Sequence, residues 1–325
     1  MAAFPKSKVD EYASACEGCT LETRADLEEF QLKRLNELLE RVSGRGLYAN
    51  YPSHLHSLAD IANLPFTSES DIIEHPSQLG MVSQSQCVRV ISDETSATTG
   101  KPKRIYYTQA DRDRTARFFE IGLQELIEPG DFVMLGFPES GELGLTDLIE
   151  EACRRIGAMC YVAEDEACYA IDQMAMLSPS AYIGHPFHIA ALLDGLATRG
   201  IAPTFTRTLI SGDSCSSDLC EAVASAIGSY PFLHYGSREI GLAGAVSCHT
   251  RKGMHIREND LLVEIVDETG NPLPDGEWGE IVITTLMQEA MPFVRYRTQD
   301  RGRILPQPCE CSSVMKRLDD KIERM

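Results

Sequence analysis

The chain has 325 residues, a formal net charge of −19 and 11 cysteines. Its length is sufficient for a substantial core in one large or two medium domains, while its acidity excludes broad attraction to nucleic acid or to an anionic membrane surface. No apolar run approaches the roughly 20 residues that span a bilayer. Residues 1–6 lack the apolar segment of a signal peptide, so we expect a cytoplasmic protein without a disulfide framework.

The predicted elements alternate between helix and strand over most of the chain. Residues 24–43 carry apolar side chains at helical spacing, and hydroxyls at 67–70 can cap a helix that starts before Ile72. We then predict, in chain order, strands at 88–91 and 105–107, a helix at 111–126, a strand at 132–135, a helix at 145–156, a strand at 181–183, a helix at 189–198 and a strand at 208–211. This alternation indicates an α/β fold with layered sheets.

The last part of the sequence is richer in strands. Residues 261–265 alternate between apolar and other side chains, and 280–284 form a second predicted strand after a turn at 271–276. We therefore divide the chain into an N-terminal helical part (1–80), an α/β core (81–247) and a β-rich subdomain (248–325).

The segment 94–103, ETSATTGKPK, lies between two of the predicted strands. Its hydroxyls and backbone N–H groups can point at an anion, Gly100 permits a backbone conformation that a Cβ would forbid, and Lys101 supplies positive charge. It is not the P-loop motif, which must open a helix. Composition alone leaves two interpretations, a phosphate-binding loop and an ordinary solvated loop.

Three later motifs follow that segment in a fixed order: 235–239 (YGSRE), 296–300 (YRTQD) and 316–320 (KRLDD). Together they resemble the core motifs of the adenylate-forming (AMP-binding) superfamily, in which a carboxylic acid reacts with ATP to give an acyl-adenylate. Segments 63–67 (NLPFT), 284–292 and 309–311 (CEC) are most similar to phenylacetate–CoA ligases. The resemblance covers roughly residues 25 to 320 and implies the large N-terminal domain of the adenylate-forming fold.

The resemblance assigns nucleotide-binding roles to individual residues. Tyr235 would pack against adenine beside Gly236, Asp300 would accept hydrogen bonds from the ribose hydroxyls, and Arg317 would also reach the ribose. Asp213 resembles an acidic residue near adenine, with a simple turn as the alternative. The departing phosphates would be held by Ser96, Thr98, Thr99, Gly100 and Lys101.

Catalysis is expected to involve Lys101, Arg238 and Glu239, with Glu239 as a ligand of Mg²⁺ whose other ligands are phosphate oxygens and water. Arg238 stands where the family usually has Thr or Ser, so its guanidinium either binds phosphate bidentately or blocks the site. Ala97 and Gln299 replace customary glycines.

The acid pocket is expected between the helix after Gly144 and the segments around His185 and Tyr235. Phe137 and Phe187 are candidates for its apolar wall, with core packing as the alternative.

Cys248, His255, Cys309 and Cys311 form a separate candidate site. Thiolate and imidazole ligands suit Zn²⁺, and four protein ligands would make the metal structural. The alternative is accidental proximity, although related phenylacetate–CoA ligases carry comparable Cys and His positions. His249 competes with His255 as the fourth ligand.

In the family, the Arg-x-Asp-Asp segment is a hinge to a C-terminal domain that carries the adenylation lysine. Here the chain stops at Met325, and Lys316 replaces the usual glycine. We expect a ligase-like enzyme that activates an aromatic or other small carboxylic acid, uses ATP and Mg²⁺, and transfers the acyl group to CoA. The alternatives are a nucleotide- or acyl-adenylate-binding protein without turnover and a subunit that needs a separate C-terminal-domain partner, and a homodimer is a further candidate assembly.

Overall fold

The computed structural model describes residues 4–18, 21–93, 103–137 and 144–325. Its helices are α1 (Lys8–Glu17), α2 (Arg24–Val42), α3 (Glu69–Glu74), α4 (Pro76–Leu79), α5 (Gln109–Gly122), α6 (Leu145–Ile156), α7 (Ala167–Leu177), α8 (Pro186–Arg199) and α9 (Ser217–Ile227). Short 3₁₀ helices are η1 (Gly46–Tyr48), η2 (Leu58–Asn63), η3 (Gln84–Gln86), η4 (Leu123–Glu125) and η5 (Arg238–Ile240). No helix among these residues is long and apolar enough to cross a membrane.

The strands of the described residues form three sheets. They are β1 (Arg89–Asp93), β2 (Lys103–Tyr107), β3 (Phe132–Gly136), β4 (Met159–Val162), β5 (Ala181–Gly184), β6 (Arg207–Ile210), β7 (Phe232–Tyr235), β8 (Ala245–Ser247), β9 (Met254–Ile256), β10 (Leu261–Val266), β11 (Gly279–Thr285), β12 (Tyr296–Gly302), β13 (Arg317–Leu318) and β14 (Glu323–Arg324). The sheets are an eight-stranded one in the order β13-β9-β8-β7-β6-β5-β3-β4, a four-stranded one in the order β10-β11-β12-β14, and the β1–β2 pair.

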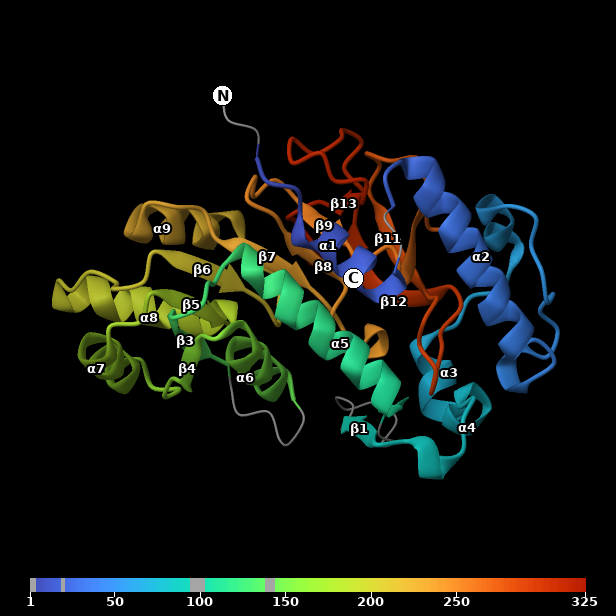
Figure 1. Ribbon diagram of the computed structural model, residues 1–325, viewed down its shortest axis with the longest axis horizontal. Coiled ribbons are helices and arrows are strands. Elements are labelled where there is room, and N and C mark those ends of the chain that lie inside the picture. Colours follow the sequence, from blue (N-terminus) through green and yellow to red (C-terminus); the bar gives the residue numbers. More distant parts are fainter. Residues whose placement is uncertain (1–3, 19–20, 94–102, 138–143) are drawn as a thin grey trace.

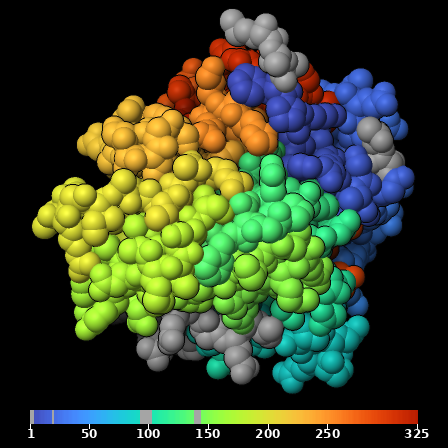
Figure 2. Space-filling view, turned by 60° about the vertical axis from the view of Figure 1, so that its left-hand side comes forward, coloured from blue at the N-terminus to red at the C-terminus, as the bar shows by residue number. Residues whose placement is uncertain are grey.

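The eight-stranded sheet is parallel from β4 to β7 and antiparallel from β7 to β13. Alternate residues of its strands point to opposite faces. Val133 and Leu135 pack in a core with residues of α1, α5 and α6, whereas Met134 packs in another with residues of α7, α8 and α9. Helices therefore cover both faces of the parallel part, as Figure 1 shows. The surface from α6 to α9 is continuous in the space-filling view (Figure 2).

Local sequence explains where several helices begin and end. Thr23 caps α2 through a capping box with Asp26, and the buried Leu27, Leu35 and Leu38 lie along one side of that helix. Gly157 ends α6 at φ 90°, a left-handed conformation that glycine adopts without strain. The predicted α/β fold with layered sheets is confirmed, and the predicted helix at 145–156 has the bounds of α6.

The predicted boundary at residue 248 crosses the eight-stranded sheet. Strands β9 and β13 lie after it, yet β9 pairs with β8 and β13 pairs with β9. The division into three parts stays a prediction about domain organisation. A third core joins α2 and the N-terminal segments to residues around Phe293. The buried Arg295 strengthens this contact, because it donates to the carbonyls of Ala62 and Leu64 and pairs with Glu264.

Candidate active site

A large cavity among the described residues lies where the parallel strands end. Phe137 follows β3, His185 follows β5, Ser211 follows β6 and Gly236 follows β7, and all four line a cavity of about 1020 Å³, here called the main cavity. Ligands of open α/β sheets bind at the carboxyl ends of the strands. The rest of the lining includes residues of other elements, with Arg89 and Ser92 in β1, Lys103 in β2, and Tyr296, Thr298 and Asp300 in β12.

A second cavity of about 460 Å³, the side cavity, adjoins the main one. The two cavities share Gly212, His234, Gly236, Ser237, Asp300 and Arg324. Asp213 lines the side cavity and accepts a hydrogen bond from the backbone N–H of Ser214 at 2.7 Å. The Asp213 side chain is exposed. Exposure agrees with both interpretations of this residue, a turn residue and a ligand-binding carboxylate at the mouth of a cavity.

The candidate phosphate-binding residues Ser96, Thr98, Thr99, Gly100 and Lys101 lie outside the described residues. Ser92 in β1 and Lys103 in β2 both line the main cavity.

Glu239 is buried at the wall of the main cavity. Its Oε1 accepts a hydrogen bond from the Tyr296 hydroxyl at 2.9 Å and forms an ion pair with the Lys103 ammonium. Burial alone would raise the pKa of the Glu239 carboxyl, but the Lys103 charge and the hydrogen bonds to the carboxylate together outweigh burial and lower it. The carboxyl is therefore ionised near neutral pH, as a ligand for a hard divalent cation must be.

Asp300 lies between the two cavities. Its Oδ2 accepts from the Tyr235 hydroxyl at 2.9 Å, and its Oδ1 accepts from the Arg324 guanidinium at 2.9 Å. Burial, followed by the negative charge of Asp300, raises the pKa of Tyr235 well above its usual value, so that this hydroxyl remains a donor. The backbone at Gly236 passes close to Leu242, because an added Cβ would lie 2.3 Å from the carbonyl oxygen of Leu242. Glycine is required by this close approach.

Positive side chains gather around the main cavity although the chain is acidic overall. Its lining includes Arg89, Lys103, Arg238 and Arg324. Burial lowers the pKa of the Arg89 guanidinium, and the charges of Arg112 and Arg238 lower it further, which indicates that like charges are close together. A polyanion in the cavity would relieve that repulsion.

Two sequence candidates have other surroundings. Arg317 is buried in β13, where its guanidinium donates to the carbonyls of Lys252 and Gln307, and it is not among the residues that line the main or side cavity. The pairing of β13 with β9 holds Arg317 in this place. Its guanidinium N–H groups are therefore already engaged in hydrogen bonds to backbone carbonyls. Phe187 is 73% exposed and lines neither cavity, whereas the buried Phe137 lines the main cavity.

Cys248, His255, Cys309 and Cys311 lie together, are all buried, and have ligand atoms within 4.8 Å of one another. The Sγ atoms of Cys248 and Cys309 are 3.7 Å apart, close to the separation of about 3.8 Å that Zn–S bonds of about 2.3 Å give in a tetrahedron. Nε2 of His255 is 3.3 Å from Sγ of Cys311, while its Nδ1 is 3.1 Å from the carbonyl oxygen of Met315.

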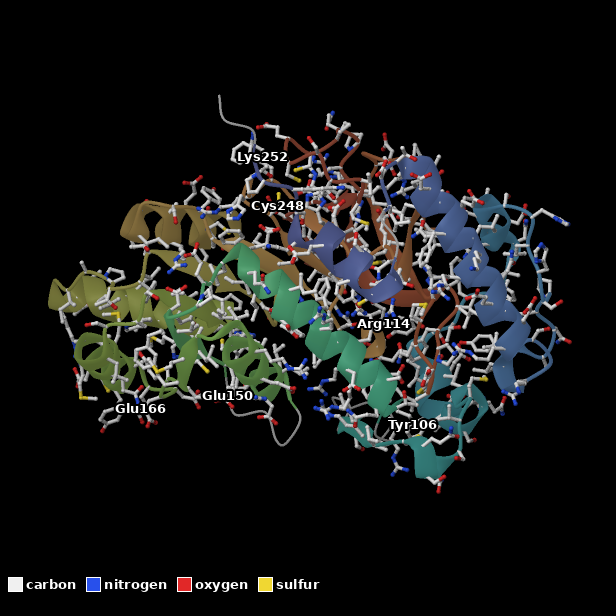
Figure 3. The ribbon with its side chains drawn as sticks, in the orientation of Figure 1. Tyr106, Arg114, Glu150, Glu166, Cys248 and Lys252 are labelled. Carbon is white, nitrogen blue, oxygen red and sulfur yellow. The ribbon has the colours of Figure 1, made fainter. Side chains whose placement is uncertain are left out.

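His249 is not part of this cluster. It lies 3.3 Å from a carboxylate oxygen of Glu125 instead. Figure 3 shows Cys248 and Lys252 at the end of the molecule near the N-terminal segment, well away from Tyr106 in β2. The cluster is therefore separate from the β1–β2 wall of the main cavity.

Sequence reasoning gave no role to several residues of the cavity wall, among them Lys103, His234, Tyr296 and Arg324. Lys103, His234 and Tyr296 are each within or next to a motif that was recognised, so adjacency was an available signal. Arg324 carries no such signal, because only the pairing of β14 with β12 brings it to Asp300.

The fold and the cavity at the strand ends define an adenylate-forming type of domain, and comparison with known proteins identifies the family. Residues 95–287 match the family model described as AMP-binding enzyme, and the chain belongs to this family. Phenylacetate-coenzyme A ligase of Pseudomonas putida is 30% identical over 270 residues, which cover 79% of this chain and 60% of the relative. That of Aromatoleum evansii is 29% identical, over 85% of this chain and 64% of the relative.

The chain thus spans about 60% of the length of these curated relatives. Among solved structures, a 2-hydroxyisobutyryl-CoA ligase in complex with 2-HIB-AMP and CoA is similar with a TM-score of 0.81 and 18% identity, over 92% of this chain and 70% of that one. The resemblance to the adenylate-forming superfamily, and to phenylacetate–CoA ligases within it, is confirmed.

Proposed function

We propose that this chain activates a carboxylic acid with ATP to an acyl-adenylate, with CoA as the acceptor of the acyl group. The observation that carries the proposal is the meeting of Lys103, Glu239 and Asp300 on one cavity. They come from three separate segments, and each belongs to or adjoins one of the ordered family motifs. The CoA ligase relatives support the same chemistry.

The nucleoside would occupy the side cavity, which Tyr235 lines and where Asp300 offers carboxylate oxygens for a ribose diol. The triphosphate would extend into the main cavity toward Lys103, Arg89 and Arg238. Their charges would stabilise the negative charge that develops as pyrophosphate departs. The acid needs no general base, since a carboxylic acid is already ionised near neutral pH.

Mg²⁺ would be held by Glu239 together with phosphate oxygens and water, and would neutralise phosphate charge when bound. Lys103 already pairs with this carboxylate. Metal and ammonium would therefore compete for Glu239, and Lys103 would be released toward the phosphates as the metal binds.

The test is acid-dependent exchange of pyrophosphate into ATP over a panel of aryl and small aliphatic acids, followed by thioester formation with CoA. Asp300→Asn should weaken ATP binding in calorimetry, and Asp172→Asn is a matched control because Asp172 pairs with Arg199 on the surface. Exchange with at least one acid supports the proposal. ATP binding without exchange for any acid would favour a nucleotide-binding protein without turnover, or a subunit whose partner supplies the remaining groups. No ATP binding at all would exclude both.

We also propose that Cys248, His255, Cys309 and Cys311 bind one structural Zn²⁺. The burial and spacing of the four groups support a closed ligand set without a position for catalytic water. The Met315 carbonyl can accept the Nδ1 proton of His255, which would leave Nε2 as the metal ligand. Purified protein should contain about one zinc per chain. A Cys309→Ser and Cys311→Ser variant that retains the metal, or zinc-free protein prepared without chelators, would contradict this assignment.

A further inference from the structure

Cys215 and Cys220 form a pair of free thiols at the N-terminal end of α9. Cys215 immediately precedes the N-cap residue Ser216, and Cys220 is the fourth residue of the helix. Their Sγ atoms are 3.1 Å apart, so the two sulfurs are in direct contact. A disulfide bond is about 2.05 Å long, and closing this pair therefore requires a movement of only about 1 Å.

The two sulfurs differ in their access to solvent. Cys220 is 5% exposed and packs in the core that includes Val223 of α9 and Leu233 of β7. Cys215 is partly exposed and lines the side cavity. A small oxidant that enters the side cavity therefore reaches Cys215 first, and Cys220 lies behind it as a second thiol.

The contact between the sulfurs also affects their acidity. The pKa of the Cys220 thiol is lowered because the Cys215 thiol donates a hydrogen bond to it, although burial and the negative charges of Asp320 and Glu221 act in the opposite direction. The free N–H groups at a helix N-terminus likewise favour a thiolate. The pair therefore loses its first proton more readily than an ordinary cysteine does, and the thiolate is the form that reacts.

We propose that Cys215 and Cys220 are a redox modification site, which a peroxide oxidises to a reversible disulfide while the side cavity is empty. An accessible thiol beside a second thiol is the arrangement that favours this chemistry. The dependence on an empty cavity rests on the proposed function, because that function places the nucleoside there.

The reaction balances with hydrogen peroxide as the oxidant. The Cys215 sulfur attacks one peroxide oxygen, its proton passes to the Cys220 thiolate, and the O–O bond breaks with loss of hydroxide, which leaves a sulfenic acid on Cys215. The hydroxide then removes the proton from Cys220 as water. The Cys220 thiolate attacks the Cys215 sulfur, so that the S–S bond forms and the S–OH bond breaks with loss of a second hydroxide. The two cysteines lose two electrons, which the two peroxide oxygens gain.

The sequence allows the disulfide to be identified directly. Trypsin cleaves after Arg207 and Arg238, and the peptide between these sites contains Cys215, Cys220 and no other cysteine. Reduced protein is treated with hydrogen peroxide, the remaining thiols are blocked with N-ethylmaleimide, and the digest is analysed by mass spectrometry. We expect this peptide to carry no label and to be two hydrogens lighter, and dithiothreitol added before blocking should restore both labels.

The rate of oxidation distinguishes a reactive pair from an ordinary thiol. At pH 7 we expect the pair to be oxidised at least about 10-fold faster than the exposed Cys168, because an ordinary cysteine is only about a few per cent thiolate at that pH. Both thiols of the pair still labelled after Cys168 has been oxidised would overturn the inference.

Two substitutions separate the roles of the sulfurs. In Cys220→Ser the reaction should stop at a sulfenic acid on Cys215, which dimedone traps, whereas in Cys215→Ser the buried Cys220 should react at least about 10-fold more slowly than the pair. Cys168→Ser is the matched control and should leave the disulfide and its rate of formation unchanged. Equal rates of oxidation in the unmodified chain and in Cys215→Ser would contradict the assignment of Cys215 as the attacking sulfur.

Binding of ATP tests the link to the side cavity. ATP with Mg²⁺ at about ten times the Kd measured by calorimetry should slow disulfide formation about 10-fold, because only the empty fraction of the protein reacts. An unchanged rate with ATP bound would overturn the dependence on an empty cavity. If calorimetry shows no ATP binding, the proposed function fails instead, and the peptide analysis without ATP still decides whether the pair is a redox site.

Discussion

Replacing Lys103 by Met tests the electrostatics of the candidate site most directly. The side chains of Lys103 and Glu239 are 12% and 6% exposed, so the substitution leaves a buried carboxylate without its cation. Of the two contacts of Glu239 with Lys103 and Tyr296, the substitution leaves the hydrogen bond from the Tyr296 hydroxyl, 2.9 Å from Oε1. Breaking a buried ion pair in this way costs about 3–5 kcal/mol.

Protonation of Glu239 limits that cost and makes it depend on pH. In the unmodified chain the pKa of Glu239 is lowered, so the pair stabilises the fold above the unfolded pKa of about 4.3 and loses this contribution as pH falls through the folded pKa. Without Lys103, burial would raise the folded pKa above 4.3. The penalty then grows as pH rises from 4.3 toward the new pKa. This part of the loss cannot exceed the free energy of keeping the carboxyl protonated, about 1 kcal/mol at pH 5 and about 3.7 kcal/mol at pH 7. The lost stabilisation of the ion pair itself adds to the loss at both pH values.

Urea unfolding of Lys103→Met and of the unmodified chain at pH 5 and pH 7 measures this difference. We expect the loss to be larger at pH 7 than at pH 5 by about 2 kcal/mol. Lys252→Met is the matched control, because the pair of Lys252 with Glu310 is 67% and 60% exposed and should contribute less than about 1 kcal/mol. Equal losses at both pH values, or a loss at pH 7 no larger than the control, would refute the reasoning. Excess Mg²⁺ should restore part of the stability if it binds Glu239 in place of the ammonium.

Three further outcomes follow from other parts of the structure. Asp300→Asn should raise the Kd for ATP by about 10- to 150-fold in calorimetry, because bonds to a charged acceptor contribute about 1.5–3 kcal/mol, and an unchanged Kd would remove Asp300 from the ribose site. Burial raises the pKa of Asp320 to about 6, so this carboxyl group destabilises the unmodified chain increasingly as pH rises from the unfolded pKa of about 3.9 to about 6. Asp320→Asn, which can still accept the Gly253 N–H bond of 3.0 Å, should therefore be more stable by about 2 kcal/mol at pH 7 and nearly equal at pH 4 in thermal or urea unfolding, and a less stable variant at pH 7 would contradict the assignment. Arg295→Met leaves Glu264 buried without its partner and should lower the free energy of unfolding by about 3–5 kcal/mol, whereas a change within about 0.5 kcal/mol would show that the pair with Glu264 does not stabilise the contact with the N-terminal segments.

The sequence by itself determined the local structure and the family. Apolar periodicity and capping residues act over a few positions, so helix α6 and strands β3, β10 and β11 could be predicted near their observed bounds. The order of the motifs identified the adenylate-forming family before any geometry was known. The chemical types of Cys248, His255, Cys309 and Cys311 likewise sufficed to nominate one cluster.

Only the tertiary structure decided which side chains face one another. Lys103 meets Glu239, Arg324 meets Asp300 and Arg317 turns to backbone carbonyls. These contacts depend on strand pairing between distant segments, which leaves no periodic trace in the sequence. The eight-stranded sheet likewise takes β9 and β13 from the segment that reads as a separate β-rich part, because the edge of β8 offers hydrogen bonds that sequence patterns do not record. Long-range burial and pairing, rather than residue type, determined the shape and charge of the site.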